Sequence, residues 1–226
     1  MIVERQVTEM ESIEILYDHY KDTYALSKVA QERRNKSFVC LCILETVAYL
    51  WAVDPQKMIV ALQSYEILSG FVNLGHEIIQ TFLWMMIVYV LIRYVQDMIY
   101  VERQYGYLTK LEIKISSIVA DEMFSRESSN YLKEYPKILN LIDLFYKMVM
   151  PVLFLVLNFV HIIMEWQYDQ KNMLSVLCDS FIFTAIFIIT WFYFFWIHSK
   201  ITNYWIEKIP IIKRIDQWLS RELKKV

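Results

Sequence analysis

The chain has 226 residues, of which 57% are hydrophobic and 21% charged, and its formal net charge is −2. Only three residues are glycine and four are proline, which excludes glycine-rich phosphate loops, dinucleotide-binding turns and nucleophile elbows. The same shortage favours long uninterrupted helices, and strand patterns bounded by turn residues are missing from the sequence. The composition therefore predicts an all-α protein that crosses a membrane.

Four segments approach the length of about 20 apolar residues that a transmembrane helix needs. They are Ser37–Val53, Ile78–Met98, Tyr146–Trp166 and Val176–His198. The last is the clearest, because FIFTAIFIITWFYFFW carries no charge, and the first is the shortest and contains Glu45. We expect two transmembrane hairpins, residues 37–98 and 146–198. Tryptophans, which membrane interfaces favour, lie near three of the ends: Trp51, Trp166 and Trp196.

Lysine and arginine are distributed unequally between the connections. Residues 1–36 carry six, residues 99–147 carry seven and residues 199–226 carry seven, whereas the other two connections carry one each. Because cytoplasmic loops are rich in these residues, both termini and the central loop are predicted to be cytoplasmic. The outer connections are predicted to be acidic, and the second of them contains Glu165, Asp169 and Asp179.

Three cytoplasmic regions are predicted around the spans. Residues 1–36 form an amphipathic helix, residues 99–145 form a helical region that continues the second span, and residues 199–226 form a basic amphipathic helix. The first region has an apolar stripe at steps of three and four: Val3, Val7, Met10, Ile13, Tyr17, Tyr20 and Tyr24. The second has heptad-like spacing that suits packing within or between subunits, at Leu108, Leu111, Ile115 and Ile118. Ser125 to Asn130 and Pro136 are expected to interrupt its helix.

The outer connection over residues 57–76 is unusually apolar for a loop. Met58, Leu62, Tyr65, Leu68 and Val72 recur at helical spacing. This pattern predicts a helix in the outer interface, with a re-entrant segment as the alternative.

Basic residues of the cytoplasmic regions are candidates for binding anionic lipid, an acidic partner protein or nucleic acid. Each base near an anionic membrane contributes about 1 kcal/mol, and binding to nucleic acid also depends on charge. The charge alone leaves these partners open. The candidates are Lys110, Lys114, Arg126, Lys213, Arg214, Arg221, Lys224 and Lys225.

Polar residues within the spans are the candidate intramembrane site. Glu45 lies about nine residues from Lys36, which places it about 13 Å deep and near the bilayer midplane. Asn158 has a similar depth, and His161 lies about one turn farther out. Because a charge that faces lipid costs several kcal/mol, Glu45 is expected to face protein or water.

Three interpretations of Glu45 remain open. In the first, Glu45 is protonated and donates a hydrogen bond that joins helices, for instance to Asn158. In the second, it lines an aqueous path that favours cations. In the third, it belongs to a proton relay with His161. Near the inner end of the second span, Arg93 and Asp97 are spaced to pair along one helix face, and Arg93 is expected to extend to the interface.

Signals of catalysis and metal binding are missing from the sequence. The three cysteines, Cys40, Cys42 and Cys178, fall in apolar runs without a metal-binding framework, and we expect them to be reduced and buried. No hydrolase or metalloprotease motif occurs, and the four histidines are scattered. We therefore predict no enzyme and no cofactor. With few glycines, four spans offer little substrate cavity in one subunit, so a pathway is expected at the shared axis of a homo-oligomer.

Residues 107–136, YLTKLEIKISSIVADEMFSRESSNYLKEYP, carry a resemblance to small bacterial membrane proteins. In these, a helix rich in lysine, leucine and glutamate precedes Ser-Arg-Glu, Tyr-Leu and Tyr-Pro, here residues 125–127, 131–132 and 135–136. The overall plan resembles the membrane components of anti-phage systems, above all Hailong and then Kiwa. The resemblance implies a bacterial inner-membrane channel, oligomeric and by resemblance tetrameric, that an inhibitory nucleic-acid ligand holds closed through cytoplasmic basic residues.

The sequence thus leads to three functional hypotheses. The first is a homo-oligomeric ion channel, gated by its cytoplasmic helices, that acts as an antiviral defence effector by depolarising the membrane. The second is a non-conducting scaffold or sensor that recruits a soluble partner protein. The third is a proton-coupled transporter in which His161 is essential.

Overall fold

A computed structural model describes residues 2–64, 75–119, 141, 145–168, 173–197 and 214. Within these ranges the chain is helical and contains no strand, and four of its helices are long and apolar enough to cross a membrane. The predicted all-α membrane fold with four transmembrane helices is therefore confirmed.

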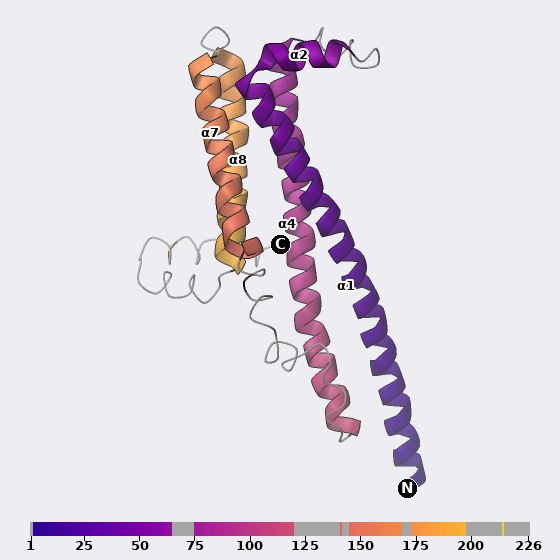
Figure 1. Cartoon of the computed structure of the whole chain (residues 1–226). Coiled ribbons are helices and arrows are strands. Elements are labelled where there is room, and N and C mark those ends of the chain that lie inside the picture. Colours follow the sequence, from indigo (N-terminus) through magenta and orange to yellow (C-terminus); the bar gives the residue numbers. More distant parts are fainter. Residues whose placement is uncertain are drawn as a thin grey trace.

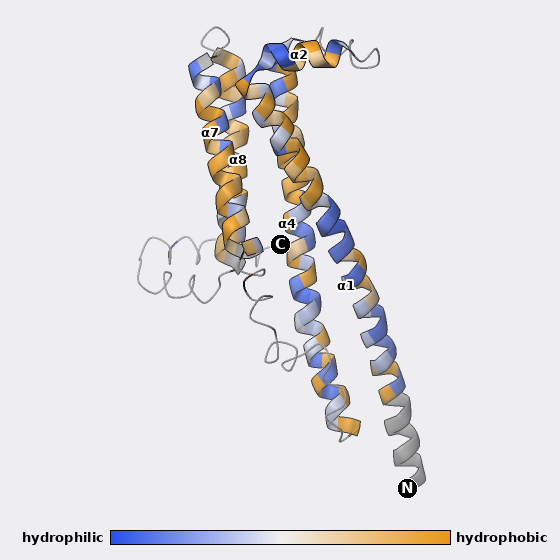
Figure 2. Cartoon of the chain, in the orientation of Figure 1, coloured by the Kyte–Doolittle hydropathy of each residue, from blue (hydrophilic) through white to orange (hydrophobic). Residues whose placement is uncertain are grey.

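Two long antiparallel helices dominate the molecule (Figure 1). Helix α1 is Ile2–Val53 and helix α4 is His76–Val119, with 52 and 44 residues. At a rise of 1.5 Å per residue they are about 78 and 66 Å long, whereas the hydrocarbon core of a bilayer is about 30 Å thick. Both helices change along their length from apolar to polar (Figure 2). We call residues 13–36 of α1 and 99–119 of α4 the stalk.

The predicted boundaries between cytoplasmic and transmembrane regions are not breaks in the chain. Residues 36 and 37 lie inside α1, and residues 98 and 99 lie inside α4. The 52 residues of α1 include no glycine or proline, so nothing interrupts the backbone hydrogen bonds between the stalk and the membrane. The stalk and the membrane half are therefore parts of the same continuous helices. Most of residues 120–144 and 199–226, including Arg126, lie outside the described residues.

The first long helix ends where Asp54 precedes Pro55. A residue before proline is disfavoured in the helical conformation, and Asp54 has φ −147° and ψ 79°. Its side chain caps a second helix, α2 (Pro55–Gln63), by accepting a hydrogen bond from the Lys57 backbone N–H at 3.1 Å. Helix α2 buries none of its residues, and it lies crosswise at the ends of α1 and α4 and extends away from α7 and α8 (Figure 1). It is the first part of the helix that the apolar loop predicted, and residues 65–74 lie outside the described residues.

The second hairpin is shorter and lies beside the apolar halves of α1 and α4 (Figure 1). Its helices are α7 (Met150–Tyr168) and α8 (Met173–Ile197), about 28 and 38 Å long at 1.5 Å per residue. A single π-helical turn, η1 (Phe145–Val149), precedes Pro151. Proline lacks an N–H and its ring crowds the carbonyl four residues earlier, which explains the wider turn. We call the end where α1 and α7 finish and α4 and α8 begin the turn end.

The four helices share one apolar core in the membrane half of the molecule. Its centre includes Trp84 and Ile87 of α4 and Ile186 of α8, none of which is exposed. Each of the four helices contributes to the cluster, so the second hairpin packs on the first. The buried members are Leu41, Ala48, Trp84, Ile87, Val90, Leu91, Ile162 and Ile186.

In the stalk, α4 packs against α1 of the same chain. The heptad residues Leu108, Leu111 and Ile115 are buried, and Ile118 is half-buried. The matching face of α1 is made of small residues, Thr23, Ser27 and Ala30, which let the two backbones approach. Packing within one subunit, one of the two arrangements that the spacing allowed, is therefore present, and packing between subunits stays a prediction.

The aromatic stripe of α1 does not form its buried face. Tyr17 and Tyr24 are 49% and 44% exposed and flank the contact with α4. Tyr20 is half-buried, and its hydroxyl donates to Oε1 of the buried Glu112 at 3.1 Å. The buried positions of α1 are thus small residues that face the leucine and isoleucine side chains of α4, and the tyrosines lie beside them.

Candidate functional site

The candidate site is a row of polar groups buried between the transmembrane helices. At its middle, Nδ2 of Asn158 on α7 donates to Oε1 of Glu45 on α1 at 2.9 Å. Asn158 is fully buried and Glu45 is 8% exposed. This contact confirms that Glu45 faces protein and that Asn158 is its neighbour at the same depth.

The direction of this hydrogen bond differs from the predicted one. Nδ2 of Asn158 also donates to the carbonyl of Phe154 at 2.8 Å. A carbonyl accepts only from a donor, so this second bond fixes the orientation of the amide. Glu45 is therefore the acceptor toward Asn158, and the prediction that it donates to Asn158 is wrong.

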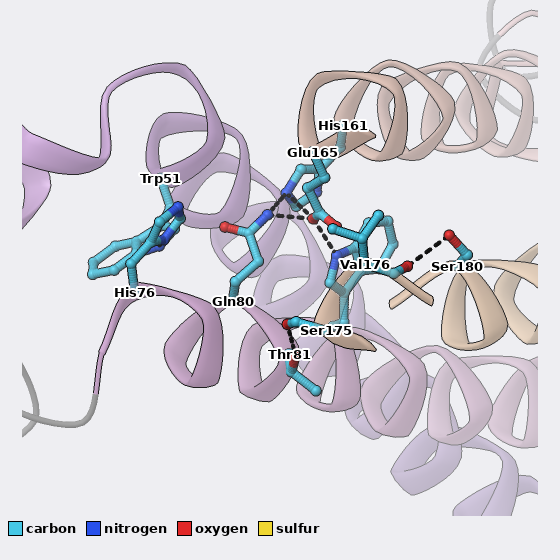
Figure 3. Close-up of polar contacts among 10 residues, drawn as sticks. Trp51, His76, Gln80, Thr81, His161, Glu165, Ser175, Val176 and Ser180 are labelled. Carbon is cyan, nitrogen blue, oxygen red and sulfur yellow. Dashed lines mark hydrogen bonds and ion pairs between the residues drawn. The ribbon is translucent and has the colours of Figure 1, made fainter. Parts of the chain in front are cut away.

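Toward the turn end, His161 and Glu165 of α7 meet Gln80 of α4 (Figure 3), and Trp84 of α4 contacts both residues of α7. Nε2 of Gln80 lies 2.9 Å from Nε2 of His161 and donates to Oε1 of Glu165. Nε1 of Trp84 donates to the same carboxylate oxygen at 2.5 Å. All four side chains are at most 4% exposed. The Trp84 and His161 rings stack with centroids 4.6 Å apart. The imidazole of His161 therefore contacts Trp84 through its face and polar groups through its Nε2 atom.

This cluster provides a place for an exchangeable proton. Nε2 of His161 lies 3.2 Å from Oε1 of Glu165. With its proton on Nδ1, the imidazole accepts from Gln80; with its proton on Nε2, it donates to Glu165. Moving one proton between the ring nitrogens thus changes the partner of His161 without moving the ring.

The spacing on α7 joins the two parts of the site. Asn158, His161 and Glu165 are separated by three and four residues, so they lie on one helix face within about 10 Å along the axis. Oδ1 of Asn158 and Nδ1 of His161 are both buried without a hydrogen-bond partner among the described residues. Buried waters typically bind such groups. One water between these two atoms would make the row continuous from Glu45 to Glu165.

Hydroxyl groups extend the row on the side away from the turn end. Tyr94 of α4 and Tyr193 of α8 have ring centroids 6.0 Å apart. Thr190 and Tyr193 are 2% and 4% exposed, and both line the same pocket as Glu45. Polar groups therefore occur inside the helix bundle from near the end of α8 to near the start of α4.

Two acidic residues were predicted in the wrong place. Glu165 and Asp179 were expected in an acidic outer connection, but they lie in α7 and α8 and are 4% and 2% exposed. Glu165 was missed as a site residue, as were Gln80 and Trp84. The spacing from Asn158 and His161 to Glu165 was the signal for it in the sequence, whereas nothing in the local sequence of α4 points to Gln80 and Trp84.

Arg93 and Asp97 do not pair with each other. Arg93 is exposed on α4, and Asp97 instead forms an ion pair with Arg33 of α1 at 3.2 Å. The salt bridge therefore joins the two long helices where the stalk meets the membrane half, rather than stabilising one helix.

The structure also places the cysteines, Trp51 and three of the basic candidate residues. The cysteines are free but exposed on the surface of the chain, because they lie on outward faces of α1 and α8. Trp51, near the end of α1, is buried within the chain, and its Nε1 donates to Nδ1 of His76 at 2.7 Å; its place at the membrane interface stays a prediction. Lys110, Lys114 and Arg214 are exposed, and the remaining basic candidates, Arg126, Lys213, Arg221, Lys224 and Lys225, lie outside the described residues.

No protein-family model matches this chain, and neither curated proteins nor solved structures yield a match. The function proposed below therefore rests on the geometry of the chain itself.

Proposed function

We propose that the protein is a gated membrane channel that conducts protons along the buried polar row of each subunit. The observation that carries this proposal is the row itself: Glu45, Asn158, His161 and Glu165 lie at successive depths between helices that are otherwise apolar. Ionisable residues at membrane depth are costly and commonly mark ion or proton pathways.

The chemistry of the row favours the proton over a metal cation. The row consists of two contacts between polar groups: the amide of Asn158 donates to the carboxylate of Glu45 at 2.9 Å, and the imidazole of His161 lies 3.2 Å from the carboxylate of Glu165. Groups so closely packed leave no room for a hydrated cation, whereas a proton passes between them through hydrogen bonds and single waters. This pathway lies inside one subunit, unlike the shared axis that the sequence suggested.

The stalk supplies the proposed gate. Glu45 and the stalk residue Tyr20 lie on the same unbroken helix, and α4 likewise joins Glu112 to Gln80. A ligand or partner that shifts the stalk would move Glu45 and Gln80 relative to α7. Such a shift would make or break the contacts of Asn158 and His161, on which continuity of the row depends.

A proton leak also fits the context that the resemblance implies. Proton entry depolarises an energised membrane, which is the outcome expected of the anti-phage membrane components that the overall plan of the chain resembles. In a homo-oligomer each subunit would carry its own pathway, with both termini on the cytoplasmic side. A cytoplasmic partner protein, anionic lipid or a nucleic-acid ligand would act on the stalk.

Proton flux into liposomes tests this proposal. Purified protein in vesicles with an internal pH-sensitive dye should acidify the lumen when a potassium gradient and valinomycin drive proton entry. Asn158→Leu and His161→Phe should each lower the rate at least about tenfold, or about 1.4 kcal/mol in barrier height. Phe181→Leu, at a position 79% exposed on α8, is the matched control. Equal flux in all four proteins would overturn the pathway.

A second function, a non-conducting sensor that recruits a partner protein, is favoured by the surface of the stalk. Ile15, Leu26 and Val29 of α1 are 51–59% exposed in its polar half. Apolar side chains gathered outside the membrane suit a protein contact. This function predicts no flux in any of the four proteins, and a copurifying protein that is lost when Leu26 and Val29 are replaced by glutamine.

A further inference from the structure

A pocket of about 320 Å³ opens beside the polar row, in the half of the membrane region farther from the turn end. Helices α1 and α7 form its sides, and Leu91 of α4 and Thr190 of α8 lie in its lining. Its volume is at the lower end of the range of about 300–1,000 Å³ typical of small-molecule sites. The pocket is thus large enough for a compact organic molecule.

The pocket is accessible from the surrounding lipid. Five of its lining residues are exposed on the outside of the bundle: Cys42, Thr46, Tyr49, Tyr146 and Leu153. Cys42 and Thr46 also line a neighbouring hollow on the outer surface of α1. A molecule dissolved in the bilayer can therefore enter sideways between α1 and α7.

Two polar groups in the pocket are incompletely satisfied. Only Oε1 of Glu45 accepts a hydrogen bond from the described residues, which leaves Oε2 available. Oγ1 of Thr190 is buried, although Thr190 lines the pocket, and has no hydrogen-bond partner in the described part of the chain. Unpaired buried polar groups cost about 1–3 kcal/mol each, so a ligand with hydrogen-bond donors would be stabilised here.

We propose that this pocket binds a lipophilic amine, with its ammonium group toward Glu45 and Thr190 and its apolar body toward the lipid. The ammonium donates to Oε2 of Glu45 and to Oγ1 of Thr190. The walls suit the same cation because six of the sixteen lining residues are aromatic, and aromatic faces attract ammonium groups. These rings belong to Phe38, Tyr49, Tyr94, Tyr146, Phe154 and Tyr193.

An acyl chain fits the pocket less well than an amine does. A hydrocarbon tail would fill the space but would leave Oε2 of Glu45 and Oγ1 of Thr190 unpaired in a drier environment. The negative charge that Glu45 can carry is matched only by a cation. The inference does not depend on the proposed function, because it concerns binding and not proton flux.

Photoaffinity labelling tests the proposal. The probe is a decylamine that carries a diazirine in its chain, and the control probe is the matching alcohol with the same chain and diazirine. The full-length protein in lipid nanodiscs is illuminated with each probe, and the labelled residues are mapped by mass spectrometry. The amine should label Cys42, Met150 and Leu153, which line the pocket, and excess unlabelled decylamine should suppress this labelling at least about tenfold, as expected when the competitor occupies most sites.

Variants separate the pocket from the general membrane surface. Leu153→Trp fills the mouth and should abolish labelling of Met150, which lines the pocket and is half-buried, whereas Phe181→Trp on the lipid face of α8 should leave it unchanged. Glu45→Gln keeps the shape of the side chain and should reduce amine labelling to the level of the alcohol. Comparable labelling by both probes, label insensitive to Leu153→Trp, or the absence of label in the pocket of wild-type protein would each overturn the proposal.

Discussion

Asn158 determines what Glu45 can do inside the membrane. Because its amide donates both to Glu45 and to the Phe154 carbonyl, Asn158 presents no donor to any other group, and its Oδ1 remains for a water or ligand. Glu45 keeps one oxygen on Asn158 and one on the pocket. One residue pair thus contributes to helix packing, to the proposed proton row and to the proposed amine site.

A double-mutant cycle measures the strength of this pair. Asn158→Leu, Glu45→Leu and the double variant should show a coupling free energy of about 0.6–1.7 kcal/mol, the range for hydrogen bonds between membrane helices. Unfolding in mixed detergent micelles gives the four stabilities. Thr46→Val is the control, since its hydroxyl donates only to the carbonyl of Cys42 in its own helix at 2.8 Å. If the two leucine substitutions changed the free energy of unfolding additively, the contact between Asn158 and Glu45 would contribute nothing to stability.

The polar residues that could be predicted from the sequence are those surrounded by apolar residues. Glu45 and Asn158 stand in the middle of apolar runs, so their depth followed from counting along the helix. Glu165 lies near a span end, where an acidic residue is ordinary and suggests an exposed loop. Its burial depends on Gln80 and Trp84 from another helix, and a contact between distant segments leaves no local pattern.

At the scale of single elements, α2 depends on its cap. Asp54 accepts from the backbone N–H of Lys57 and pairs with its ammonium group at 2.7 Å. Both bonds favour the ionised carboxylate and lower the pKa of Asp54 below its usual value of 3.8, with the side-chain bond from Lys57 as the largest cause.

The start of α2 should therefore loosen in acid. A carboxyl whose pKa is lower in the folded state stabilises that state above the usual value of 3.8, and this stabilisation is lost as the pH falls below it. The rate of hydrogen exchange at the Lys57 amide, corrected for its intrinsic pH dependence, should therefore rise as the pH is lowered below 3.8. Asp54→Ala should exchange fast at every pH, whereas Lys57→Met should keep most of the protection, because the backbone bond remains. Protection that is independent of pH and of Asp54 would contradict the role of the cap.

Helix α4 offers a test of coupling between the stalk and the membrane half. Gly106 is exposed, and a methyl group added there would meet no atom within 4 Å. Gly106→Ala should stabilise the helix by about 0.5–1 kcal/mol, whereas Gly106→Pro costs about 3 kcal/mol in a helix interior and should break it.

Both variants are compared in the liposome flux assay, in the presence and absence of whatever ligand or partner changes the wild-type rate. Gly106→Ala should respond as the wild type does. Gly106→Pro should retain a flux that no longer responds, because its stalk is disconnected from the transmembrane half of α4. A normal response of Gly106→Pro would mean that the signal does not travel along this helix.

Helix continuity was predictable, but the buried faces of the helices were not. The absence of glycine and proline from α1 and their scarcity in α4 indicate long helices, both inside and outside the membrane. Which face of the α1 stalk is buried depends on its partner: Ser27 and Ala30 are chosen over Tyr17 and Tyr24 because α4 approaches closely. Hydrophobicity alone would place the tyrosines, and not the small residues, against α4.

For the whole molecule, the two hairpins have different shapes. The first combines a membrane half with a long stalk, whereas α7 and α8 of the second are much shorter than α1 and α4 (Figure 1). The polar row lies between them, with Glu45 and Gln80 on the first hairpin and Asn158, His161 and Glu165 on the second. Relative movement of the hairpins would therefore act directly on the row. The row was not foreseeable as a whole, because it exists only once the hairpins pack.

The reversal potential of the purified protein in a planar bilayer tests the central claim most directly. With equal salt on both sides and a pH difference of one unit, a proton pathway should give a reversal potential near 59 mV, the value for a tenfold gradient of a singly charged species. Replacing potassium by a large organic cation should not shift it. A reversal potential that stays near zero under the pH gradient, or that follows the potassium gradient instead, would contradict conduction through the buried row.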